Sequence, residues 1–79
     1  MKFTEFMDLA LAAKDGDENA LSALVAYCRT EVNLESVRSS EILIAYHLAA
    51  AKFLSNQHAF PTYPPEKVTA IVASLDCTG

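Results

Sequence analysis

Apolar residues recur at helical spacing along most of the chain, and this pattern predicts a series of short helices. The first set lies near the N-terminus, at spacings of three and four residues: Phe3, Phe6, Met7, Ala10 and Leu11. That spacing places the apolar side chains on one face of a helix. We expect this first helix to begin after Thr4, acting as its N-cap, and to end at Lys14.

A tight corner is predicted next, because Asp15 and Gly16 interrupt the first helix. Gly16 suits the left-handed backbone of a C-terminal cap, and Asp17 can cap the start of a second helix. The apolar stripe of that second helix consists of Leu21, Leu24, Val25 and Cys28, with Ala20 and Tyr27 beside it.

The third predicted helix is the longest, and its end lies at about Asn56. Four residues can begin it: Asn33, Ser36, Ser39 and Ser40. The segment Glu31–Glu41 is polar and compatible with a helix. From Ile42 to Leu54 the residues are apolar nearly all round the helix, and His47 and Lys52 are the only strongly polar ones. A helix that is apolar on every side is normally central and buried, or shared between subunits.

A loop and a final helix complete the pattern. The loop covers residues 57–65 and carries Phe60, Tyr63 and all three prolines. Pro64 and Pro65 can start the last helix, because its first N–H groups have no intrahelical partner. The stripe of this helix is Val68, Ile71, Val72 and Leu75.

These elements predict an all-α fold, because no stretch alternates apolar and polar residues as a strand does. We expect a compact bundle of about four short helices over residues 1–79, forming a single domain with the third helix central and apolar. A chain of 79 residues buries a smaller share of its surface than a large protein does. Its stability as a monomer is therefore expected to be marginal, and association would increase it.

The charge distribution disfavours nucleic acid as a partner. The ten acidic and six basic residues give a net charge of −4, and the basic residues are scattered along the chain. Nucleic-acid affinity depends mainly on clustered lysine and arginine residues. The composition favours a protein partner instead, and in particular one with a basic surface.

No group of residues in the sequence has the spacing of a catalytic or metal site. His47 and His58 are the only histidines, and Cys28 and Cys77 the only cysteines. None of them has the short spacing of a zinc site or a predictable nucleophile–base pairing. We therefore expect neither enzymatic activity nor a cofactor, and two reduced thiols rather than a disulfide.

The acidic corner has some features of a calcium loop. Asp15, Asp17 and Asn19 stand at positions 1, 3 and 5 of a possible EF-hand loop. However, Ala20 stands where the loop needs glycine, and Ala26 where it needs a glutamate. Capping of a solvated helix corner explains these residues better than calcium does.

The same corner resembles the first helical corner of bacterial sigma factors. The residues that carry this resemblance are Ala13, Gly16, Asp17, Ala20 and Leu24. The chain departs from that family afterwards, since it has neither a second acidic motif nor a basic promoter-reading helix. The resemblance therefore implies a shared way of capping a helix and no shared function.

The compartment predicted from the sequence is the cytoplasm. Glu5 and Asp8 interrupt what would be the apolar region of a signal peptide. The longest apolar run, Ile42–Ala51, is about half of the ~20 residues that a membrane span requires.

The leading functional hypothesis is a small non-enzymatic protein that binds another protein, including a second copy of itself as a homodimer. Size and class are typical of phage or mobile-element products that inhibit or adapt a host machine. The alternative is a small helical transcription regulator acting on DNA or polymerase. The candidate partner-binding residues are Asp15, Asp17, Glu18, Tyr46, His47, Phe60 and Tyr63.

Overall fold

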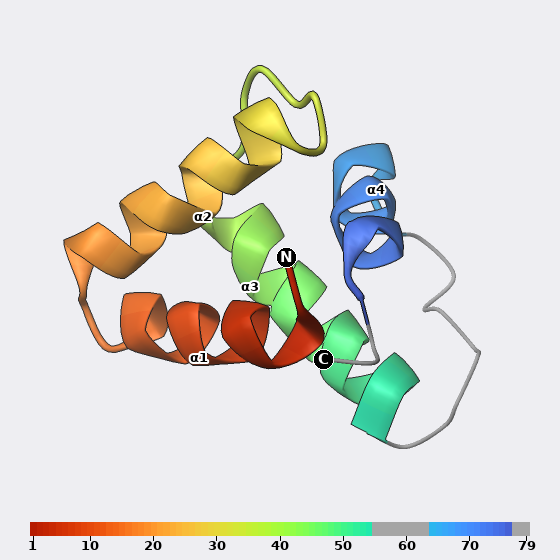
Figure 1. Ribbon diagram of the computed structural model, residues 1–79, viewed down its shortest axis with the longest axis horizontal. Coiled ribbons are helices and arrows are strands. Elements are labelled where there is room, and N and C mark those ends of the chain that lie inside the picture. Colours follow the sequence, from red (N-terminus) through yellow and green to blue (C-terminus); the bar gives the residue numbers. More distant parts are fainter. Residues whose placement is uncertain (55–63, 77–79) are drawn as a thin grey trace.

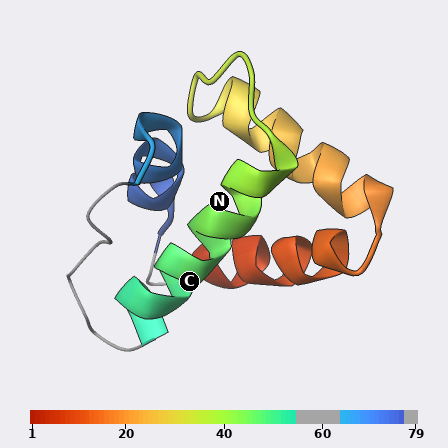
Figure 2. The same ribbon diagram turned by 180° about the vertical axis from the view of Figure 1, so that it is seen from behind.

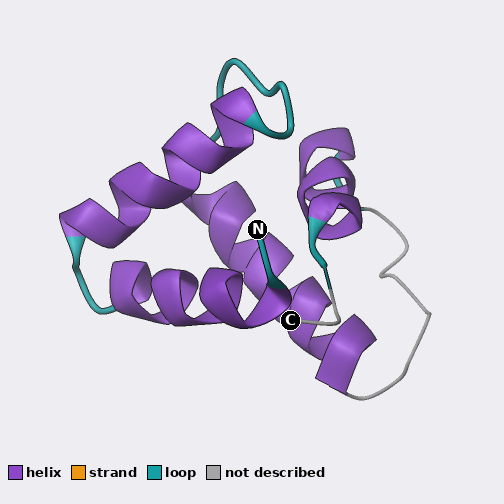
Figure 3. Cartoon of the chain, viewed as in Figure 1, coloured by secondary structure: helices purple, strands orange, loops and turns teal. Residues whose placement is uncertain are grey.

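Helices form where the apolar stripes predict them. The computed structural model describes residues 1–54 and 64–76. Within these ranges the chain forms four α-helices and one π-helical segment (Figure 1): α1 (Phe3–Lys14), α2 (Glu18–Thr30), α3 (Ser39–Ala49), η1 (Ala50–Leu54) and α4 (Glu66–Ser74). No strand occurs in the described residues (Figure 3). The predicted all-α class is confirmed.

The third helix occupies a central position. α1 packs against both α2 and α3, and α3 also packs against α4. Helix α3 passes behind α1 in Figure 1 and lies in front of it in the reverse view of Figure 2. The molecule measures 30 × 22 × 20 Å along its principal axes. The prediction of a compact bundle with a central third helix is therefore confirmed.

All four α-helices contribute to one hydrophobic core. The predicted stripe of α4 is buried along its whole length, including Leu75 just beyond the helix. The fully buried large side chains are Phe6, Leu24, Cys28, Ile42, Val68, Ile71 and Val72. Tyr27 of α2 is also buried, and its hydroxyl shares a hydrogen bond with the Ser74 hydroxyl of α4. This bond links the two helices at the edge of the core.

The corner between α1 and α2 has the predicted caps. Gly16 has a φ of +104°, a backbone conformation that glycine adopts without the steric cost of a side chain. The Asp17 carboxylate accepts hydrogen bonds from the backbone N–H groups of Asn19 at 2.9 Å and Ala20 at 3.2 Å. An N-cap of this kind contributes about 0.5–2 kcal/mol to helix stability.

The predicted start of α1 is wrong by about two residues. The helix begins at Phe3, its N-cap is Lys2, and Thr4 lies within the first turn. The cause is a long-range contact between the chain ends, where Lys2 and Asp76 form a single parallel bridge. The Phe3 N–H donates to the Asp76 carbonyl at 2.9 Å. Because the C-terminal segment satisfies this N–H group, the helix starts without a capping side chain.

Most of the polar segment before α3 is not helical, although its composition is compatible with a helix. Residues 31–38 form a loop, and α3 begins at Ser39, one of the four predicted starts. Asn33 has a φ of +58°, a left-handed conformation that cannot continue into a right-handed helix. The loop is fixed to the core by three half-buried side chains: Val32, Leu34 and Val37.

The π-helical segment η1 follows α3 directly and changes which residue faces the core. In a continuing α-helix, the position three residues after Ala49 and four after Leu48 would point inward, and that residue is Lys52. A π-helix takes one more residue per turn, because its hydrogen bonds join residues five apart. Phe53 consequently turns toward the core and packs edge-on against Phe3, with the ring centroids 5.2 Å apart.

The last predicted helix begins slightly later than expected. Pro65 is the N-cap of α4 rather than part of its first turn, and Glu66 is the first helical residue. The predicted end of the third helix at Asn56 and the aromatic loop residues Phe60 and Tyr63 lie outside the described residues.

Candidate protein-binding face

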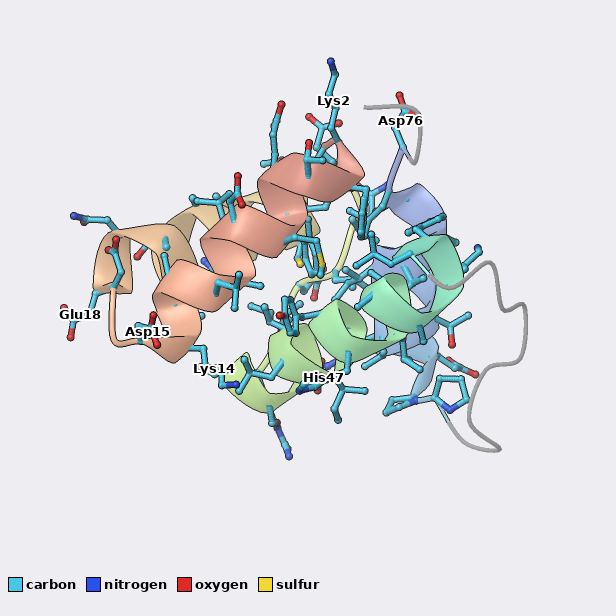
Figure 4. All side chains as sticks on the ribbon, turned by 90° about the horizontal axis from the view of Figure 1, so that it is seen from below. Lys2, Lys14, Asp15, Glu18, His47 and Asp76 are labelled. Carbon is cyan, nitrogen blue, oxygen red and sulfur yellow. The ribbon has the colours of Figure 1, made fainter. Side chains whose placement is uncertain are left out.

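The predicted binding residues lie at two separate places in the described part of the chain. Asp15, Asp17 and Glu18 are exposed at the corner between α1 and α2. Tyr46 and His47 belong to α3. Figure 4 shows the labelled Asp15 and Glu18 well apart from the labelled His47. The structure therefore does not bring the acidic residues and the α3 residues together in one site.

Helix capping explains two residues of the acidic corner, Asp17 and Glu18. Both hydrogen bonds to the Asp17 side chain come from the start of α2. Carboxylates are stabilising near a helix N-terminus, and this accounts for Glu18 in the first turn as well. No metal-ligand group of three or more histidine, cysteine or acidic residues occurs within residues 1–54 and 64–76.

The outward side of α3 forms an exposed apolar surface. The inward side of the helix buries Ile42, Ala45, Leu48 and Ala49. On the side facing away from the core, at its border with the inward side, Ile44 is 42% exposed, although large aliphatic side chains are normally buried. We define the α3 outer face as the residues at helical spacing on this side, with Leu43 half-buried and the others exposed: Ser40, Leu43, Ile44 and His47.

The α3 outer face contains no aspartate, glutamate, lysine or arginine. Glu41, the one acidic residue of α3, lies toward the inward side and is half-buried. Its Oε2 atom is buried and has no hydrogen-bond partner among the described residues. Along the helix axis, the α3 outer face thus has apolar residues in the middle and a polar residue at each end.

Tyr46 and His47 take different roles despite being neighbours. The two rings meet edge-on, with centroids 5.1 Å apart. Tyr46 is half-buried and packs against the core, whereas His47 is exposed on the α3 outer face. Of the two predicted residues, His47 is therefore the one available to a partner.

Sequence reasoning missed Ile44, the exposed large aliphatic residue of the α3 outer face. The sequence showed that α3 is apolar nearly all round, so no polar side marked the direction of solvent. Ile44 stands four residues before the buried Leu48, so helical spacing places it next to the core side and does not mark it as exposed.

Cys28 is a free thiol whose side chain is completely buried. Burial raises the pKa of the Cys28 thiol, and the nearby negative charge of Glu41 raises that pKa further. Because the thiolate is the reactive form of cysteine, the Cys28 side chain is unsuited to nucleophilic chemistry. The possible partner of a disulfide, Cys77, lies outside the described residues.

We expect Cys28 in a Cys77→Ala variant to react with a thiol reagent only when the protein unfolds. Since the folded state keeps the thiol protonated, it binds more protons than the unfolded state above about pH 8.5, the ordinary pKa of a thiol. The free energy of unfolding should therefore fall as the pH rises through the alkaline range. Denaturant titrations at a series of pH values measure this fall.

The control for the alkaline effect is a Cys28→Ala variant, which lacks the titrating thiol. Its unfolding free energy should depend less on pH in the same range. Rapid labelling of Cys28 in the folded Cys77→Ala variant, or equal pH dependence with and without Cys28, would contradict the burial described above.

No helix within the described ranges combines the length and apolar character needed to cross a bilayer. Comparison with known proteins finds no matching family, no matching characterised protein and no matching solved structure.

Proposed function

We propose that this chain is a small non-enzymatic domain that binds another protein through the α3 outer face. The observation that supports the proposal is the exposure of Ile44 among the α3 outer-face residues, none of which is acidic, lysine or arginine, while the inward side of α3 is buried in the core. Binding a partner would remove this apolar surface from water, at roughly 25 cal/mol per Å² of buried apolar area.

The acidic corner remains a secondary part of the proposal. Asp15 and Glu18 are exposed, and a partner with a basic surface would pair with them through long-range attraction that salt weakens. A role as a cytoplasmic inhibitor or adaptor of a host machine, of the kind that phages and mobile elements encode, would use either surface. Action on DNA is less favoured, because the exposed start of α2 carries Asp17 and Glu18, whose charge repels phosphate.

The experiment compares the wild-type chain with an Ile44→Glu variant as bait for binding partners. Ile44→Glu places a charge in the centre of the α3 outer face. Ala23→Glu is the matched control, because Ala23 is exposed on a different helix, α2. Circular dichroism establishes that both variants are folded.

The proposal expects a protein, the chain itself included, that binds the wild type and the Ala23→Glu variant. Its affinity for Ile44→Glu, measured with purified components, should fall at least tenfold. A partner that binds all three chains equally would place the binding site elsewhere. Absence of any protein binding by the folded wild type would refute the function.

A further inference from the structure

We draw no further inference here: the strongest candidate, the side-chain cluster of the half-buried Glu41 of α3 and the buried Cys28 of α2, rests on one cysteine and the raised pKa of its thiol, and no third histidine, cysteine or acidic residue joins the pair among residues 1–54 and 64–76 to make a ligand site.

Discussion

Replacing Phe6 with alanine is expected to bring the domain close to unfolding under native conditions. Phe6 is completely buried in the core that all four α-helices share. Truncating a buried phenylalanine to alanine costs about 3–5 kcal/mol, because burial is lost and a cavity remains. A domain of this length has a total stability of roughly 4–12 kcal/mol. The substitution therefore removes a large part of it.

The measurement is thermal and denaturant unfolding of the Phe6→Ala variant followed by circular dichroism. For a domain of this size, the expected loss corresponds to a fall in Tm of roughly 15–30 °C. Leu11→Ala is the matched control, since Leu11 lies in the same helix and is 44% exposed. We expect that control to lose less than about 1 kcal/mol. Equal losses in the two variants would mean that α1 faces the core with a different side.

The second large effect is expected at the π-helical segment, where Phe53→Ala should cost about 2–3 kcal/mol. The value is below that for Phe6 because Phe53 is half-buried and packs at the edge of the core. Lys52→Ala should cost less than about 1 kcal/mol, even though Lys52 lies where a regular α-helix would face inward. Its ammonium group stands 5.1 Å from the centroid of the Phe53 ring.

Denaturant unfolding of the two single variants and of a Phe3→Ala, Phe53→Ala double-mutant cycle measures this effect. The edge-on ring contact should appear as a coupling free energy of about 0.5–1.5 kcal/mol between Phe3 and Phe53. A larger loss for Lys52→Ala than for Phe53→Ala would show that the helix continues without the π-turn, with Lys52 toward the core.

The sequence by itself determined where most helices lie and which class of fold they form. Stripes such as Val68, Ile71 and Val72 are spaced for one helix face, and all three are buried. The corner between α1 and α2 was also predictable, because Gly16 and Asp17 satisfy local backbone requirements. Local signals of this kind act through residues at most a few positions away.

The tertiary structure decided the features that depend on distant residues. The start of α1 depends on the Asp76 carbonyl, which lies at the other end of the described chain. The non-helical loop before α3 depends on Val32, Leu34 and Val37 packing on the core, which overrides a weak helix preference. The π-turn places Phe53 against Phe3, a choice that no local pattern requires.

The candidate site was predictable only in part, for the same reason. The sequence pointed to the third helix and to His47, because a polar residue stood out in an apolar segment. It did not identify Ile44, since a helix that is apolar nearly all round carries no mark of its exposed side. Only the packing of α1 and α4 against α3 decided which side is buried and which faces solvent.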